Sequence, residues 1–189
     1  MTMSVKDAIQ TRRAYRSLEK VEITEEIINE LSLAASLSAS CFNNQPWRFV
    51  FVYEKEDLER FKVVFNKGNE WCHADSLVIA VVSEKELDCD VKGRQYYLFD
   101  TGMATAQLIL RATELGLVAH PIAGYDEQKV KELLSVPENM TVITLVNVGK
   151  HSDKISPVLS EKQVRDEKER PSRLPLDKIV FRGRYEAQS

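Results

Sequence analysis

The chain has 189 residues, a formal net charge of −3, 43% hydrophobic residues and 29% charged residues. Such a composition is typical of one folded domain and excludes an intrinsically disordered chain. No apolar run approaches the roughly 20 residues that span a bilayer, and the first residues lack the apolar core of a signal peptide. We therefore expect no membrane partner and a cytoplasmic location.

Cysteine and histidine usage argues against a metalloprotein. The three cysteines, Cys41, Cys72 and Cys89, are odd in number, widely spaced and form no CxxC pair. We therefore expect neither a disulfide framework nor a zinc site. The histidines lack the spacing of metal ligands, and the motifs of Walker-type nucleotide sites, zinc proteases and serine hydrolases do not occur. No metal is expected.

Apolar residues at the helical period predict several helices. Thr24 is a suitable N-cap, and Gly116 stands where the longest helix should end. Asp126 is suited to begin a further helix. The predicted helices cover residues 5–9, 24–38, 56–66, 96–115 and 126–136.

Three stretches have the pattern of strands. Residues 47–53 alternate and place their aromatic side chains on one face, whereas residues 77–82 are wholly apolar, as in a central strand. Residues 142–148 alternate and should end at Gly149. Strands mixed with helices predict a layered α+β or α/β domain.

The two ends of the chain are basic, whereas the middle is acidic. Residues 1–20 carry five Lys/Arg against two Asp/Glu, and residues 150–189 carry ten against seven. The ends could converge on one anion or be two solvated tails. After Gly149 the chain has little periodicity but retains apolar residues, so we expect this extension to dock on another surface, such as a second copy.

Four polar clusters stand at the ends of the predicted elements. Arg12, Arg13 and Arg16 suit a phosphate, because guanidinium donates paired hydrogen bonds, but a solvated basic turn explains them too. The others are Ser40, Asn43 and Gln45, the stretch from His120 to Tyr125, and Arg182 with Arg184. The amides suit a flat heterocycle or merely cap a helix, the 120–125 stretch exposes backbone N–H groups or merely connects elements, and the last pair suits an anion or a frayed end.

In this order and spacing, the clusters resemble the nitroreductase family of FMN-dependent oxidoreductases. The matching stretches are AIQTRRAYR (8–16), SxxNxQPWRF (40–49), DTGMATAQLILRATELGL (100–117) and HPIAGYDEQKVKELLSVP (120–137), continuing to LVNVGK (145–150). The resemblance implies an α+β fold with a central, mostly antiparallel sheet flanked by helices, in an intertwined homodimer. Residues 1–150 would form the FMN-binding domain, and residues 151–189 an extension exchanged with the partner subunit.

The resemblance also implies which residues hold FMN. Arg12, with Arg13 and Ala14 beside it, would bind the phosphate, and Arg16 would lie near the pyrimidine edge of the flavin. Ser40, Asn43 and Gln45 would reach the flavin of the partner subunit. Pro121, Ile122, Ala123 and Gly124 would line one flavin face, with the backbone of Ala123 and Gly124 near N5, and Arg182 and Arg184 would close on the phosphate.

The implied activity is hydride transfer from NADH or NADPH, through flavin N5, to an electron-poor small molecule such as a nitroaromatic or a quinone. The flavin supplies the chemistry, so no catalytic side chain is expected. Nucleic acid is not expected as a partner. The alternative is a module that binds, stores or senses FMN without turnover.

Overall fold

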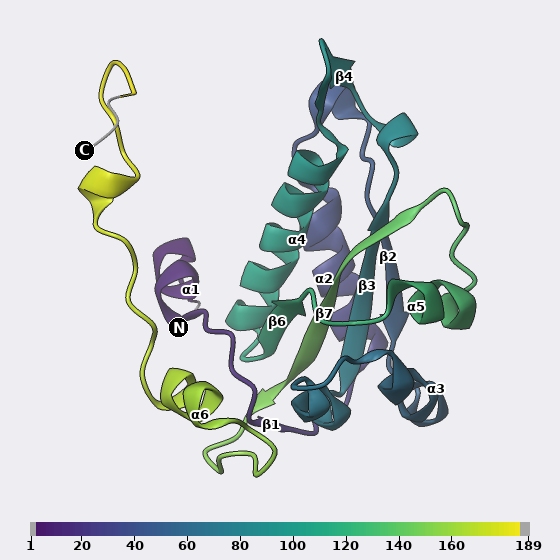
Figure 1. The fold of residues 1–189 in the computed structure, drawn as a ribbon, viewed down its shortest axis with the longest axis vertical. Coiled ribbons are helices and arrows are strands. Elements are labelled where there is room, and N and C mark those ends of the chain that lie inside the picture. Colours follow the sequence, from purple (N-terminus) through teal and green to yellow (C-terminus); the bar gives the residue numbers. More distant parts are fainter. Residues whose placement is uncertain (1–2, 186–189) are drawn as a thin grey trace.

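The computed structural model describes residues 3–185 and has an α+β fold, with helices on both faces of a central antiparallel sheet (Figure 1). The helices are α1 (Val5–Thr11), α2 (Glu25–Ser36), α3 (Lys55–Phe61), α4 (Tyr97–Glu114), α5 (Glu127–Leu134) and α6 (Glu161–Lys168). The strands are β1 (Leu18–Glu19), β2 (Arg48–Val52), β3 (Leu77–Ser83), β4 (Asp90–Val91), β5 (Arg94–Gln95), β6 (Val118–Ile122) and β7 (Thr141–His151). Short 3-10 turns are η1 (Cys41–Asn43), η2 (Lys62–Val64), η3 (Glu70–Ala74), η4 (Lys85–Leu87) and η5 (Leu176–Lys178).

The centre of the sheet is β3, which pairs with the long strand β7. β3 pairs with β2 on one side and with β7 on the other, and all three run antiparallel to their neighbours. The far side of β7 pairs first with β6 and then with β1. Every residue of β3 is buried, which confirms the prediction of a central strand over residues 77–82.

The two faces of β3 belong to two hydrophobic cores. Ile79 and Val81 lie in the core under α2 and α4, whereas Val78 and Ala80 lie in the core that includes residues of α3 and α5. This alternation follows from the period of two in a strand. Caps predicted from the sequence are present, because Thr24 accepts a hydrogen bond from the third residue of α2 and Asp126 does the same for α5.

β7 is longer than the sequence predicted, because Gly149 does not end it. The strand continues to His151 and gains a third partner, β1, which the sequence did not predict. A Cβ on Gly149 would lie 3.3 Å from the Cβ of Leu18 and 3.4 Å from the carbonyl oxygen of Glu19. Gly149 therefore permits the close approach of β1.

The C-terminal extension contains a helix that the apolar pattern did not predict. Ser160 and Gln163 form a capping box at the start of α6, which lies beside the N-terminal segment (Figure 1). Beyond α6 the chain runs past α1 and away from the sheet, with η5 near its end (Figure 1). The exposed large hydrophobic residues of this last described stretch include Leu174, Leu176, Ile179 and Val180.

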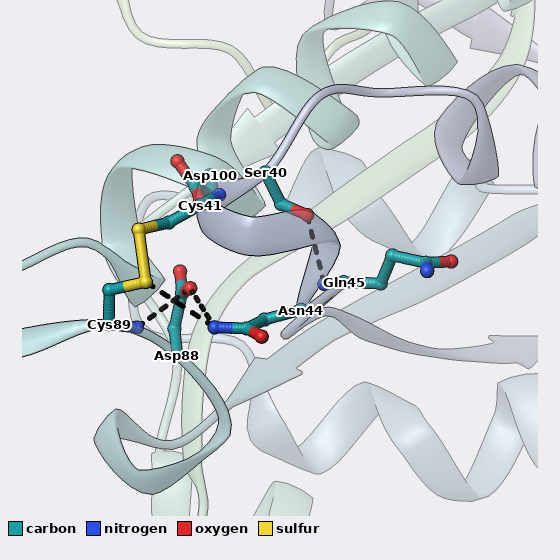
Figure 2. Close-up of a disulfide and its surroundings, with 7 residues drawn as sticks. All are labelled: Ser40, Cys41, Asn44, Gln45, Asp88, Cys89 and Asp100. Carbon is teal, nitrogen blue, oxygen red and sulfur yellow. Dashed lines mark hydrogen bonds between the residues drawn. A yellow bond between two sulfur atoms is a disulfide. The ribbon is translucent and has the colours of Figure 1, made fainter.

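The expectation that the cysteines form no disulfide was wrong. Cys41 and Cys89 are bonded to each other, and Cys72 is buried as a free thiol. The partners are 48 positions apart, so their spacing gave no signal. The fold brings them together because the segment between β3 and α4 returns to the loop that follows α2 (Figure 2). In the described part of the chain, no helix is long and apolar enough to cross a bilayer.

Candidate functional site

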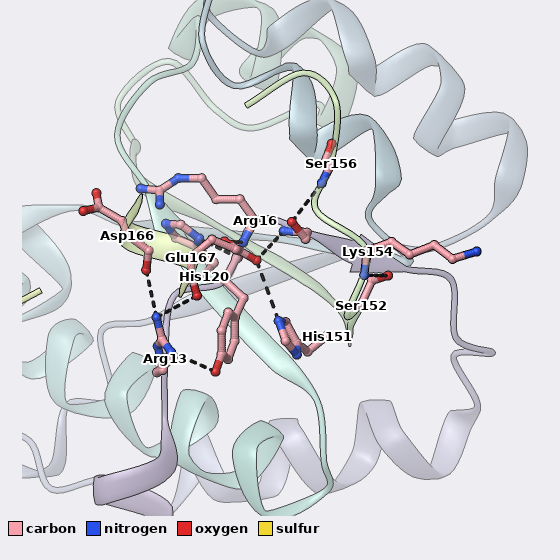
Figure 3. Close-up of polar contacts among 11 residues, drawn as sticks. Arg13, Arg16, His120, His151, Ser152, Lys154, Ser156, Asp166 and Glu167 are labelled. Carbon is pink, nitrogen blue, oxygen red and sulfur yellow. Dashed lines mark hydrogen bonds and ion pairs between the residues drawn. The ribbon is translucent and has the colours of Figure 1, made fainter. Parts of the chain in front are cut away.

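The arginine cluster lies on an extended segment between α1 and β1. α1 ends at Thr11, and Arg12 leaves the helix with φ −51° and ψ 123°. The guanidinium of Arg13 donates to the backbone carbonyls of Asp166 and Glu167, at 2.8 and 3.0 Å (Figure 3). It also lies over the ring of Tyr15, with 4.4 Å between the guanidinium carbon and the ring centroid. Arg13 therefore fastens α6 to this segment.

Glu167 makes the complementary contact from α6. Its side chain is 1% exposed, and its carboxylate accepts hydrogen bonds from the backbone N–H groups of Arg16 and Ser17, at 3.0 and 2.9 Å (Figure 3). His151 lies 3.8 Å away through Nε2. Ionic hydrogen bonds to a buried carboxylate are among the stronger polar contacts in proteins. Arg13 and Glu167 together fix the arginine segment against the C-terminal extension.

This arrangement creates a basic cavity of about 180 Å³. Arg170 donates to the backbone carbonyls of Gln10 and Arg12, at 2.7 and 2.8 Å. Burial lowers the pKa of Arg12, and the positive charges of Arg170 and Arg173 lower it further. Like charges held this close favour an anion between them. The cavity is lined by Arg12, Arg13, Ala14, Arg16, Asp166, Arg170, Pro171 and Arg173.

Arg16 lies beside a stacked pair of aromatic rings. Trp71 and His120 stack with their centroids 4.7 Å apart, and the guanidinium carbon of Arg16 lies 6.0 Å from the centroid of a Trp71 ring. Nδ1 of His120 lies 3.0 Å from the carbonyl oxygen of Tyr15. Burial lowers the pKa of His120 to about 4. The neutral imidazole thus joins β6 to the arginine segment.

The predicted flavin-lining stretch follows directly from this contact. Pro121 and Ala123 are exposed, whereas Ile122 is buried. The carbonyl oxygen of Gly124 accepts hydrogen bonds from the backbone N–H of Asn66 and from Nδ2 of Asn69, at 3.1 and 2.9 Å. A Cβ on Gly124 would lie 2.4 Å from that Nδ2, so the close approach requires glycine. The structure therefore brings residues 121–124 and the arginine segment to one side of the molecule.

The amide-rich loop after α2 is tightly turned. Phe42, Asn43 and Gln45 have φ values of 48°, 60° and 51°, which are uncommon outside glycine. Oγ of Ser40 accepts a hydrogen bond from the backbone N–H of Gln45 at 3.0 Å (Figure 2). Nε2 of Gln45 donates to the Asn43 carbonyl at 3.1 Å. Ser40 thus closes the loop, while the side chains of Asn43 and Gln45 remain exposed.

The loop and the arginine cavity do not meet within one chain. The loop lies beside β4, because Cys41 is bonded to Cys89 next to that strand, and β4 is at one end of the molecule (Figure 1). α6, which borders the arginine cavity, lies toward the opposite end of α4 (Figure 1). Among the described residues, the cavity lining includes Arg170 and Arg173 but neither Arg182 nor Arg184.

Several residues at the site were not singled out from the sequence. Arg170, Arg173 and Glu167 belong to a helix and its exit, and the Ser160–Gln163 capping box is the signal that could have found that helix. Trp71 lies on a 3-10 turn, where neither apolar periodicity nor strand alternation applies.

Comparison with known proteins gives the class of the fold and site. The model of the Nitroreductase family matches residues 9–71 and 62–150. A protein of Archaeoglobus fulgidus named "Putative NADH dehydrogenase/NAD(P)H nitroreductase" is 28% identical over 149 residues, which cover 77% of this chain and 84% of that protein. The chain belongs to the nitroreductase family.

Solved structures agree with this assignment. A nitroreductase family protein from Clostridium novyi NT has a TM-score of 0.74 and 27% identity, over 80% of this chain and 87% of the other. A crystal structure described as an oxidoreductase containing FMN has a TM-score of 0.83 and 26% identity, over 96% of this chain and 92% of the other. The predicted α+β fold with a central antiparallel sheet is confirmed.

Proposed function

We propose that this chain is an FMN-dependent oxidoreductase that uses NADH or NADPH to reduce an electron-poor small molecule, such as a nitroaromatic or a quinone. The observation that carries the proposal is the basic cavity in which the charges of Arg170 and Arg173 act on Arg12. The donor set fits the phosphate of FMN, because planar guanidinium groups donate paired hydrogen bonds to phosphate oxygens. FMN, when bound, would supply the redox chemistry of the reaction.

Each part of the chain has a distinct task in this proposal. Arg12, Arg170 and Arg173 hold the phosphate, and Glu167 keeps the segment that carries Arg12 in place. Arg16 supplies a positive charge, which would stabilise negative charge on the pyrimidine edge of a reduced flavin. The segment 121–124, in which Pro121 and Ala123 are exposed, would line one face of the flat flavin ring.

A second copy of the chain would complete the site. Ser40, Asn43 and Gln45 lie away from the arginine cavity of their own chain, so in this proposal they reach the cofactor of the partner. Exposed apolar residues on three helices suit such a dimer, because the interfaces of homodimers are more apolar than the rest of the surface. They include Val5 and Ile9 of α1, Leu33 of α2, and Leu98 and Phe99 of α4. In this proposal Arg182 and Arg184 would close on the phosphate from an extension exchanged with the partner.

The phosphate assignment is tested by comparing FMN with riboflavin, which lacks the phosphate. Quenching of flavin fluorescence gives both dissociation constants for the wild type, Arg173→Ala and Arg182→Ala. Loss of a charged hydrogen bond to phosphate costs about 1.5–3 kcal/mol, or about 10-fold to 150-fold in affinity. We expect Arg173→Ala to weaken the binding of FMN by that factor and to change the binding of riboflavin little.

The control is Arg60→Ala, which removes an exposed arginine that pairs with Asp57 on α3. It should bind both flavins as the wild type does. An equal loss for FMN and riboflavin in Arg173→Ala would contradict a phosphate contact. A larger loss of FMN binding in Arg182→Ala would place the contact on the terminal pair instead.

The oxidoreductase assignment is tested separately under anaerobic conditions. NADH or NADPH should bleach the flavin absorbance of the FMN-loaded protein, and a quinone or nitroaromatic should restore it. Binding of FMN without bleaching by either nucleotide would contradict the enzyme and favour a storage or sensing module.

A further inference from the structure

The Cys41–Cys89 disulfide ties the amide-rich loop to the segment before β4 (Figure 2). Both cysteines are partly exposed, whereas Cys72 is only 2% exposed. Burial raises the pKa of the Cys72 thiol, and the nearby Asp75 raises it further. A reductant in solution can thus reach the disulfide, while the remaining thiol is shielded.

Apart from the disulfide, few contacts tie residues 41–45 to the rest of the described chain. Phe42 is 90% exposed, so its side chain adds almost no packing. Among the described residues, the hydrogen bonds from the loop to the rest of the chain include one from the Cys41 backbone N–H to Asp100, at 2.6 Å, those from the Asn44 side chain to the segment before β4, and one from the Arg48 side chain to the Gln45 carbonyl, at 3.1 Å. Backbone with positive φ outside glycine persists only where the surroundings enforce it. The covalent bond is therefore a principal constraint on the conformation of residues 41–45.

The surroundings of the disulfide distinguish its two sulfur atoms. Nδ2 of Asn44 lies 3.4 Å from Sγ of Cys89 and 3.2 Å from Oδ1 of Asp88 (Figure 2). A carboxylate oxygen of Asp88 lies within 4.8 Å of both sulfur atoms. The Asn44 amide can stabilise a thiolate that forms on Cys89, whereas the negative charge of Asp88 disfavours both an approaching thiolate and the thiolate on Cys89.

We propose that the Cys41–Cys89 disulfide is a redox-active site that undergoes exchange with dithiols. A thiolate of the dithiol attacks Sγ of Cys41, the bond between the two sulfur atoms breaks, and Cys89 leaves as a thiolate beside Asn44. The second thiol of the reductant then displaces Cys41. The dithiol is oxidised to a disulfide, and Cys41 and Cys89 gain two electrons and, with two protons, become thiols.

Opening the disulfide frees the loop that carries Ser40, Asn43 and Gln45. This consequence rests on the proposed function, in which these side chains reach a flavin. A loop that must be ordered on binding lowers affinity, because its conformational entropy is lost at that point. The reduced protein should therefore bind FMN more weakly than the oxidised protein, by about tenfold.

The first test counts thiols with a chromogenic disulfide reagent in denaturant. Protein purified without reductant should show one thiol per chain, and protein treated in its native state with excess dithiothreitol, then desalted without air, should show three. Three thiols before treatment would overturn the disulfide. One thiol after treatment would overturn exchange in the folded protein.

Reduction rates test the chemistry at the two sulfur atoms. Asn44→Ala should slow reduction by dithiothreitol several-fold, and Asp88→Asn should accelerate it, whereas Cys72→Ala should leave it unchanged. Equal rates in all four proteins would contradict the roles of the amide and the carboxylate.

Loop release is measured without any flavin. Chymotrypsin should cut after Phe42 several-fold faster in the reduced wild type and in the double variant Cys41→Ser/Cys89→Ser than in the oxidised protein. Equal cleavage would overturn the loop constraint. Failure of the oxidised protein to bind FMN would contradict the proposed function alone, whereas tight binding with no change on reduction would contradict only the link between the two.

Discussion

Oε1 of Glu167 accepts a hydrogen bond from the backbone N–H of Ser17 at 2.9 Å, across 150 positions of the chain. The other carboxylate oxygen accepts from the N–H of Arg16 at 3.0 Å. A single side chain near the end of α6 thus organises the backbone from which Arg16 extends. In return, Arg13 binds two carbonyls at the end of α6. The basic cavity depends on this reciprocal contact between the two ends of the chain.

Replacement of Glu167 should affect stability and phosphate recognition together. Glu167→Ala leaves two N–H groups without their buried acceptor, so we expect the free energy of unfolding to fall by about 2–4 kcal/mol. Urea unfolding measures this change. Glu167→Gln retains one acceptor oxygen and should recover part of the loss, and Glu169→Ala, at an exposed position, should lose little. If Glu167→Ala weakened the binding of riboflavin as strongly as the binding of FMN, Glu167 would not act through the basic cavity.

Protonation of His120 should destabilise the fold in weak acid. Burial lowers its pKa from 6.5 to about 4, so the unfolded chain binds the proton more readily. The stability that the neutral ring contributes is present above pH 6.5 and is lost as the pH falls toward 4, by up to about 3 kcal/mol. Urea unfolding between pH 7.5 and 4.5 measures the slope. His120→Gln should be less stable at pH 7.5 but show a shallower decline, and an unchanged slope would contradict this role.

Asp75 should respond to pH in the opposite sense. The residue is 1% exposed, and neither carboxylate oxygen has a hydrogen-bond partner among the described residues. Burial raises its pKa well above the usual value, against the opposing charge of Lys20. Neutral Asp75 therefore contributes stability at low pH that is lost as the pH rises above about 4. Asp75→Asn should raise the free energy of unfolding at pH 7 by about 1 kcal/mol or more. A loss of stability in Asp75→Asn at pH 7 would show that the folded protein stabilises the charged carboxylate of Asp75.

Replacement of Gly124 should cost more when Asn69 is present than when Asn69 is also replaced. In Gly124→Ala the new Cβ would meet Nδ2 of Asn69, which also bonds the Gly124 carbonyl. We expect a cost of about 1–3 kcal/mol, because Asn69 must move and lose that hydrogen bond. In a double-mutant cycle, the double variant Gly124→Ala/Asn69→Ala should lose less stability than the sum of the losses in the two single variants. Additive losses of stability would mean that positions 124 and 69 are not energetically coupled.

The sequence predicted most elements because each carries a local signal. Thr24 and Asp126 cap helices, and the apolar run of β3 marks a central strand. Features that depend on contacts between distant positions were missed, as with the Cys41–Cys89 bond.

The candidate site shows the same division. Arg12 and Arg16 could be found because they stand in a compact motif, whereas Arg170 and Arg173 acquire their position only through the contact between α6 and the N-terminal segment. Apolar periodicity cannot reveal α6, because the helix is strongly polar and its buried residue is Glu167.

The absorbance spectrum of the purified protein, before and after addition of FMN, tests the central claim most directly. We expect flavin bands in the blue and near-ultraviolet, at about one FMN per chain after removal of free flavin. Because the proposed site requires the loop of a second copy, the flavin should elute with a dimer in size-exclusion chromatography. A colourless protein that takes up no FMN would contradict the account, and the basic cavity at Arg12 would then serve another anion.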